Sequence, residues 1–289
     1  MHCLNLKITY DCNNNCSYCF SSKLKNENIE LDNILKALEN GYLRGCRMLV
    51  ISGGEPTLYP KKIIKIINRA LSIGYTNFII QTNGSGINGD LAEFLNQTQG
   101  VSISFSILGS NEKTHDKITG TVGSFKKLIR GLIDIHNNCN VITNTVISKL
   151  NIKELSDIVD LILPFSPTVM QFSIMHTHYD KNYIGLIESV KAIKELSFSG
   201  KISSEVLRTE GITPCLLKGF EKCIGENYWP KKLDVYNYNN SNIIRLNQLE
   251  SKMRFKAQFC KKCLLDEICH GVWIETKDEF LQCIEKGIY

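Results

Sequence analysis

The sequence predicts an α/β protein in which a parallel sheet is followed by a small cysteine-rich region. Six segments with the pattern of a β-strand alternate with six amphipathic helical segments, which is typical of parallel strands joined by helical crossovers. After residue 212 this periodicity weakens, while six of the 12 cysteines lie beyond that point. We therefore expect a large domain over residues 1–200 and a smaller one over residues 201–289.

The expected strands are short, and most of them are apolar. Residues 4–10 alternate apolar and polar side chains, which predicts a half-buried strand. Later segments are richer in valine, isoleucine and phenylalanine, as buried strands of a parallel sheet are. The strands are predicted at residues 4–10, 48–52, 77–82, 101–107, 141–147 and 168–175.

The expected helices follow from apolar positions spaced three and four residues apart. In the first of them, Ile34, Leu35 and Leu38 share one face; Gly74 is a suitable C-cap for the second, and Pro164 ends the fifth. The helices are predicted at residues 31–42, 62–73, 90–97, 123–137, 152–163 and 184–196.

The composition excludes several classes of protein. The net charge of +5 is mild, and no lysine run is interleaved with aromatics, which argues against a nucleic-acid partner. No apolar run has the length of a membrane span, and the first residues lack a signal peptide, so we expect a cytoplasmic protein without a membrane association. In that reducing compartment, clustered cysteines are more often metal ligands or catalytic groups than disulfides.

Three cysteines follow directly on the first strand, in the loop that contains Cys12, Cys16 and Cys19. Metal and iron–sulfur sites usually have four protein ligands, so three thiolates suggest a cluster with one open metal position. Alternatively, the loop belongs to a structural metal site whose fourth ligand is distant in sequence, such as Cys3, Cys46 or a histidine.

A turn of Gly53, Gly54, Glu55 and Pro56 follows the second strand. Two residues without side chains allow a ligand to approach the backbone closely, and the carboxylate of Glu55 suits an ammonium group. A plain turn before a helix would explain the same residues. The turn and the cysteine loop together are more specific than either one, because both follow strands of a parallel sheet, where such folds place their chemistry.

These two motifs resemble those of the radical S-adenosylmethionine (radical SAM) superfamily. The resemblance extends over most of residues 3–175, through the motifs 82–84, 104–109 and 115–120 and Asn144. Leu108 is a departure, because many peptide-modifying members have an acidic residue there.

The resemblance implies a partial (β/α)6 barrel of the TIM type, with SAM bound to the open iron of a [4Fe–4S] cluster held by the three loop cysteines. Tyr18 would contact the adenine region, while Gly53, Gly54 and Glu55 would contact the methionyl amine of SAM. Softer candidates for contacts to SAM or its ribose are Asn83, Ser106 and Asn144. The cleaved SAM would give a 5′-deoxyadenosyl radical that abstracts hydrogen from a substrate.

The C-terminal cysteines are similar to SPASM and twitch extensions, which carry auxiliary iron–sulfur clusters. Trp273 stands where a full SPASM pattern has a further cysteine, so we expect one auxiliary [4Fe–4S] cluster rather than two. Its expected ligands are Cys215, Cys260, Cys263 and Cys269, with Cys283 as the rival of Cys215. A structural zinc site remains the alternative, because thiolate spacing alone does not choose the metal.

Cys223 is left outside this set. In some radical SAM epimerases a cysteine thiol returns a hydrogen atom to the substrate radical, and Cys223 is our candidate for this catalytic role. The alternative is a structural thiol, as we also expect for Cys3, Cys46 and Cys139. The last candidates, His176 and His178, follow the sixth strand and either line the substrate cavity or lie at its polar rim.

These features predict a radical SAM oxidoreductase or maturase that acts on a peptide or a small metabolite by oxidation, crosslinking or epimerisation. An epimerase or dehydrogenase of a sugar or amino-acid metabolite is the alternative, and a non-catalytic iron–sulfur or zinc scaffold is the alternative of another class. The expected partners are an electron donor such as flavodoxin or ferredoxin and, because the chain starts at the first strand, a separate peptide-binding protein.

Overall fold

The computed structural model describes residues 1–19, 21–24, 29–135, 139–176, 180–237, 243–246 and 252–287. Nine strands form one sheet in the order β7-β6-β5-β4-β3-β2-β1-β8-β9, and β9 is antiparallel to β8. The strands are β1 His2–Thr9, β2 Met48–Gly53, β3 Asn77–Thr82, β4 Val101–Ser106, β5 Asn140–Ile147, β6 Val169–Ile174, β7 Leu207–Glu210, β8 Lys232–Tyr236 and β9 Ile244–Arg245. The α/β fold class with a mostly parallel sheet is confirmed.

The chain divides into two compact units that alternate along the sequence. Unit 1 comprises Met1–Ser106, His115–Ile142 and Pro230–Asn247, and unit 2 comprises Ile107–Thr114, Thr143–Trp229 and Gln248–Tyr289. These units are not the two domains expected from the sequence, so the boundary at residue 200 stays a prediction.

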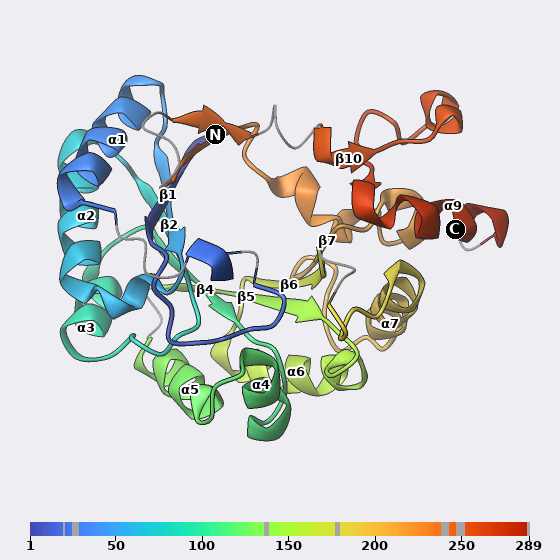
Figure 1. Cartoon of the computed structure of the whole chain (residues 1–289), viewed down its shortest axis with the longest axis horizontal. Helices are drawn as coiled ribbons and strands as arrows, with labels where there is room; N and C mark the ends of the chain where they lie inside the picture. The colour runs from blue at the N-terminus through green and yellow to red at the C-terminus, as the bar shows by residue number, and fades with distance from the viewer. Residues whose placement is uncertain are drawn as a thin grey trace. The chain divides into compact units, whose positions relative to one another are not determined.

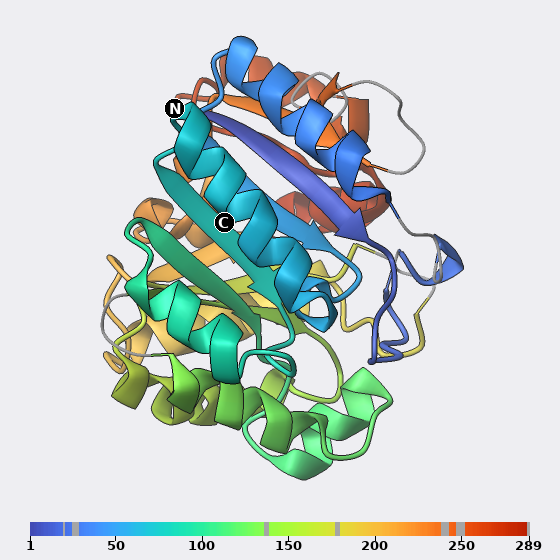
Figure 2. The same ribbon diagram turned by 90° about the vertical axis from the view of Figure 1, so that its left-hand side faces the viewer.

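Unit 1 contains β1 to β4, β8 and β9, with helices over one face of the strands (Figures 1 and 2). Apolar side chains such as Ile34 and Leu38 of the first helix and Ile63 of the second are fully buried against the sheet. The helices are α1 Leu31–Leu43, α2 Pro60–Ile73, α3 Gly89–Gln97, α4 Glu112–Thr119, whose first turn belongs to unit 2, and α5 Ser124–Asp134.

Unit 2 contains most of β5 together with β6 and β7, and continues into the cysteine-rich segment. Its helices are α6 Leu155–Ile162, α7 Leu186–Phe198 and α9 Lys277–Glu285, and a short antiparallel pair joins β10 Arg254–Phe255 to β11 Val272–Trp273. Figure 1 shows this segment, in orange and red, ending in α9. No helix within the described ranges is long and apolar enough to cross a membrane.

All six predicted strands and all six predicted helices are present, with ends shifted by a few residues. The predicted end of the fourth helix, at residues 136 and 137, lies outside the described residues. Helix α4 and strands β7 to β11 were not predicted. They are eight residues long or fewer, and most are too short to show a period.

Candidate active site

The cysteine loop leaves the end of β1 and is anchored at several points of unit 1. The Asn15 amide donates to the Thr119 carbonyl at 2.8 Å, and the Cys19 amide donates to the Cys16 carbonyl at 3.1 Å. The Asn14 amide lies 3.4 Å from the Cys12 sulfur and donates to it. Such N–H···S hydrogen bonds stabilise a thiolate, and all three cysteines of the loop are partly accessible. The loop therefore has the donor set and the exposure that a metal cluster needs.

The two glycines after β2 are required by the close approach of the chain after β1. A Cβ atom on Gly53 would lie 2.0 Å from the Thr9 carbonyl oxygen, and one on Gly54 would lie 2.2 Å from that of Asp11. Gly53 also has a φ of 136°, which disfavours other residues. The Gly54 amide donates to Thr9 and the Glu55 amide to Asp11, at 2.8 and 2.7 Å. The glycines thus hold the turn against the root of the cysteine loop.

Glu55 is 1% exposed, and its carboxylate is saturated by donors of unit 1. One oxygen accepts from the Thr57 amide at 2.9 Å and from the hydroxyls of Thr57 and Thr82, at 2.5 and 2.6 Å. The other accepts from the Asn83 amide at 2.6 Å. Burial raises the pKa of Glu55, and these hydrogen bonds oppose the rise. In this arrangement the carboxylate ties the end of β3 to the turn, and the contact to an amine stays a prediction.

Asn83 connects that turn to the cysteine loop. Its amide nitrogen donates to the Asn13 side-chain oxygen at 2.8 Å, and its own oxygen accepts from the Ser85 amide at 3.0 Å. Asn13 in turn donates to the Ser85 hydroxyl at 2.8 Å. The structure therefore brings Asn83, Gly53, Gly54 and the three loop cysteines into one hydrogen-bonded region of unit 1.

Four cysteines of unit 2 line one small pocket. They are the four expected auxiliary ligands, Cys215, Cys260, Cys263 and Cys269. Cys283, the rival ligand, is fully buried in α9 and is not among the lining residues. The wall is completed by apolar groups that include Phe255 and Phe280.

Hydrogen bonds to sulfur are repeated around this pocket. The Leu265 amide donates to the Cys263 sulfur at 3.4 Å, the Gly271 amide to that of Cys269 at 3.3 Å. Burial raises the pKa of Cys269, and the Gly271 amide opposes the rise. A bound metal would lower the thiol pKa further, because metal coordination deprotonates a thiol. The pocket has the donor chemistry of an iron–sulfur or zinc site.

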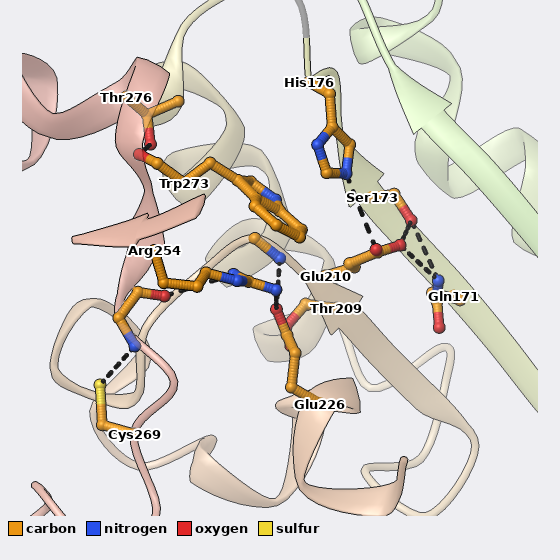
Figure 3. Close-up of polar contacts among 12 residues, drawn as sticks. Gln171, Ser173, His176, Thr209, Glu210, Glu226, Arg254, Cys269, Trp273 and Thr276 are labelled. Atoms are coloured by element: carbon orange, nitrogen blue, oxygen red, sulfur yellow. Dashed lines mark hydrogen bonds and ion pairs between the residues drawn. The ribbon is translucent and has the colours of Figure 1, made fainter. Parts of the chain in front are cut away.

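A polar network lies on one face of β5, β6 and β7 within unit 2 (Figure 3). The Glu210 carboxylate accepts from the Ser173 hydroxyl and from the Gln171 amide, each at 2.9 Å. Ser173 also lies 2.7 Å from the Asn144 side-chain oxygen. The His176 Nε2 atom lies 3.8 Å from the other oxygen of Glu210. Asn144, the predicted SAM contact, is thus part of a network that ends in a carboxylate.

The remaining predicted residues are placed separately. Tyr18 lies in the cysteine loop and Ser106 ends β4, and both are half-buried. Cys223 is fully buried, its carbonyl oxygen accepts from the Thr209 hydroxyl at 3.2 Å, and burial raises its pKa. His178 lies outside the described residues. Cys3, Cys46 and Cys139 are core thiols, as expected.

Glu210, Gln171 and Arg254 were not predicted as site residues. Gln171 and Ser173 are two residues apart in the predicted sixth strand and alternate with apolar residues. Side chains two residues apart in a strand lie on the same face, so this spacing was the signal for a shared polar face. Glu210 ends a strand of four residues, and Arg254 belongs to one of two. Neither strand is long enough for its period to be recognised in sequence.

The chain is similar in sequence to a maturation protein and a maturase. It is 28% identical over 158 residues to the sporulation killing factor maturation protein SkfB of Bacillus subtilis, covering 54% of this chain and 38% of the relative. It is 28% identical over 178 residues to the mycofactocin maturase MftC of Mycolicibacterium smegmatis, covering 58% and 43%. The matched part of the chain thus spans less than half of the length of either relative.

The fold is similar to that of two solved enzymes. Streptococcus suis SuiB bound to S-adenosylmethionine superposes with a TM-score of 0.67 at 15% identity, covering 93% of this chain and 72% of that chain. Native anSMEcpe with bound AdoMet superposes with a TM-score of 0.65 at 18% identity, covering 94% and 89%. At these identities the similarity establishes the fold, which is the TIM-like fold expected.

A sequence model of the Radical SAM superfamily matches residues 6–162, which is more than half of the chain. The matched range contains the cysteine loop, the Gly-Gly-Glu-Pro turn and Asn83. The chain therefore belongs to the Radical SAM superfamily, whose members use a [4Fe–4S] cluster and SAM.

Proposed function

We propose that the protein is a radical SAM oxidoreductase or maturase that abstracts hydrogen from a peptide. The observation that carries the proposal is the hydrogen-bonded region of Cys12, Cys16, Cys19, the Gly-Gly-Glu-Pro turn and Asn83. The similarity to the maturation protein SkfB and the maturase MftC supports a maturation reaction, and Streptococcus suis SuiB, which has a similar fold, was solved with a bound precursor peptide. A peptide could reach the protein directly or through a separate peptide-binding partner, and a flavodoxin or ferredoxin would supply electrons.

In this proposal Cys12, Cys16 and Cys19 would hold the cluster, and three thiolates would leave one of its metal positions to SAM. When bound, the cluster would supply the reducing electron for SAM cleavage. Within unit 1 the chain itself would position SAM: Tyr18 contacts the adenine, the backbone of Gly53 and Gly54 the methionyl group, and Ser106 the ribose side. Glu55 stabilises the Gly-Gly-Glu-Pro turn, because its carboxylate accepts a hydrogen bond from the Asn83 backbone amide.

The auxiliary cluster is the second part of the proposal. Cys215, Cys260, Cys263 and Cys269 line one pocket, and four thiolates would saturate a [4Fe–4S] cluster there. A saturated cluster offers no open position to a ligand, and it would accept the electron released when a substrate radical is oxidised. Zinc fits the same donors, so metal analysis decides between them.

Reductive SAM cleavage tests the proposed activity. Anaerobically purified and reduced protein should convert SAM to 5′-deoxyadenosine, detected by chromatography and mass spectrometry. Cys16→Ala should abolish this conversion, whereas Cys139→Ala, which removes a core thiol of unit 1, should retain it. A fully loaded protein that forms no 5′-deoxyadenosine would instead favour the non-catalytic scaffold.

Cys223→Ala tests the hydrogen-donor role that an epimerase would need. If Cys223 is the donor, the variant should still cleave SAM while the epimerised product is lost. Full burial of the thiol favours packing instead, and then the variant should lose about 1 kcal/mol of stability and keep its product. Product analysis and chemical unfolding of the same sample separate the two roles.

A further inference from the structure

The carboxylate of Glu210 is held as an anion by neutral donors. Ser173 and Gln171 both donate to the same oxygen, Oε2, at 2.9 Å. The side chain is 18% exposed, so it is largely but not completely removed from solvent. Burial opposes its ionisation, yet the contacts with His176 and Ser173 hold the pKa of Glu210 below its ordinary value. Burying a carboxylate costs free energy of folding. A largely buried carboxylate at the end of a strand is therefore a candidate for a functional group.

The other oxygen of Glu210, Oε1, makes weaker contacts than Oε2. Its contact is the His176 Nε2 atom at 3.8 Å, which is too long for a hydrogen bond, and the His176 side chain is 47% exposed. Among the residues that the structure describes, no lysine or arginine makes an ion pair with Glu210. Oε1 is therefore the acceptor of this network that remains available to a ligand.

The guanidinium that could have neutralised Glu210 is engaged elsewhere. Arg254 Nη2 lies 3.2 Å from an oxygen of Glu226, and its guanidinium carbon lies 3.3 Å from the centre of the Trp273 ring. Glu226 is 3% exposed and accepts from the Gly211 amide as well. The charge of Arg254 still lowers the pKa of Glu210, but its hydrogen bond goes to Glu226, so Arg254 leaves the Glu210 carboxylate without a direct guanidinium contact.

Two further polar atoms near Glu210 and Arg254 lack hydrogen-bond partners. The Trp273 indole nitrogen and Glu226 Oε2 are buried and have no hydrogen-bond partner among the described residues. Trp273 is 3% exposed and its ring centre lies 4.0 Å from that of His176 (Figure 3). Its nitrogen also lies 2.9 Å from where a Cβ atom on Gly211, the residue after Glu210, would stand. Unsatisfied buried polar groups of this kind commonly mark sites where a ligand completes the hydrogen bonding.

We propose that Glu210 and His176 form a recognition site for an alkylammonium group of the substrate, a lysine side chain or a free amino terminus of a peptide. The ammonium donates to Glu210 Oε1, while the His176 ring lies beside its aliphatic chain. This inference rests on the proposed peptide substrate and names its chemical class. Ser173, Gln171 and Asn144 act as positioning residues, because they fix the carboxylate without touching the ligand.

Calorimetric titration of the SAM-saturated, unreduced holoenzyme tests this site without requiring radical chemistry. Three peptides serve as probes: Ac-Gly-Lys-Gly-NH2, the neutral Ac-Gly-Gln-Gly-NH2, and Gly-Gln-Gly-NH2 with a free amino terminus. A charged hydrogen bond predicts that at least one cationic peptide binds about tenfold more tightly than the neutral one. Whichever cationic peptide shows the preference identifies the lysine side chain or the amino terminus as the source.

Glu210→Gln should abolish this preference, because it removes the charge and keeps the shape. Glu205→Gln is the matched control, since that carboxylate is 74% exposed and contacts only Lys222 among the described ion pairs. Equal binding of the three peptides to the native protein, or a preference that survives in Glu210→Gln, would overturn the proposal. Loss of SAM cleavage with the preference intact would contradict the proposed activity and leave this site standing.

Discussion

At the scale of single residues, two buried titratable groups of unit 1 have structural effects that the sequence motifs do not reveal. Glu55 and His115 both belong to the motifs that resemble the radical SAM superfamily, and each is 1% exposed. The carboxylate of Glu55 is satisfied by four hydrogen bonds, whereas the imidazole of His115 packs 5.6 Å from the Phe125 ring. Their substitution should therefore change stability through different physical causes.

Glu55→Ala should lower the free energy of unfolding by about 3 kcal/mol, because buried donors of Thr57, Thr82 and Asn83 lose their acceptor. Chemical denaturation of the anaerobic protein measures this loss. Glu93→Ala, at an exposed position of α3, is the control and should change stability by less than about 0.5 kcal/mol. A loss in Glu55→Ala as small as in the control would show that the carboxylate contributes little to the fold.

Burial lowers the pKa of His115 to about 4, against the weaker opposite effect of Asp116. The unfolded chain therefore binds a proton near pH 6.5 that the folded chain takes up only near pH 4. Stability is lost as the pH falls through this window, by about 2 kcal/mol between pH 6.5 and pH 5.

His115→Leu should remove that part of the pH dependence. The free energy of unfolding, measured at pH 7 and pH 5, should fall less in the variant than in the native protein. Identical slopes in the two proteins would mean that folding does not lower the pKa of His115.

At the scale of elements, β8 carries a fully buried aspartate whose hydrogen bonds reach β1 and two partly exposed arginines. Asp234 of β8 is fully buried and accepts from His2 at 3.0 Å, from Arg44 at 2.7 Å and from Arg245. His2, Cys46 and Asp234 also place three ligand atoms within 4.8 Å of one another. Two arginines on the carboxylate disfavour a cation there, so we interpret the cluster as a salt-bridge network that stabilises the parallel pairing of β8 with β1.

Asp234→Asn should destabilise unit 1 by about 2 kcal/mol, since the variant removes the charge of a fully buried carboxylate that accepts hydrogen bonds from two partly exposed arginines, Arg44 and Arg245. Hydrogen exchange should become faster in β8 and in the facing part of β1. Asp160→Asn is a suitable control, because its pair with Lys201 is solvent-exposed and contributes less than about 1 kcal/mol. Unchanged exchange in β8 would show that backbone pairing alone holds the strand.

At the scale of the whole molecule, we propose two metal centres, one in each unit. The first would have three cysteine ligands in unit 1, and the second would have the four cysteines that line one pocket of unit 2. Only the second would then be closed by protein ligands. If both are [4Fe–4S] clusters, the protein should contain about eight iron atoms per chain.

Cys215→Ala should reduce the iron content to about half, whereas Cys283→Ala should leave it unchanged, because Cys215 lines the pocket and Cys283 does not. Iron, sulfide and zinc analysis of anaerobically purified protein measures both. One zinc ion per chain would show that the four cysteines form a structural zinc site and not an auxiliary iron–sulfur cluster. Loss of iron in Cys283→Ala, with full iron content in Cys215→Ala, would show that Cys283 and not Cys215 is the fourth ligand.

The order of the first six strands and of six helices, the fold class and the superfamily could be predicted from the sequence. These features depend on local patterns: a period of two or 3.6 residues, or three cysteines in eight positions. Long elements such as α2, with buried residues Ile63, Ile66 and Ile67 on one face, show that pattern clearly. The glycines of the Gly-Gly-Glu-Pro turn were recognised too, although their close contact with Thr9 and Asp11 was not.

Contacts between distant segments were decided only by the tertiary structure. Glu210, Trp273 and Arg254 lie on strands of two to four residues, and nothing in their sequence indicates that they meet. The pairing of β8 with β1 is another contact between distant segments, because Asp234 and His2 are 232 residues apart. A sequence records which side chains are available along a chain, but long-range packing of apolar surface determines which of them come within hydrogen-bond distance.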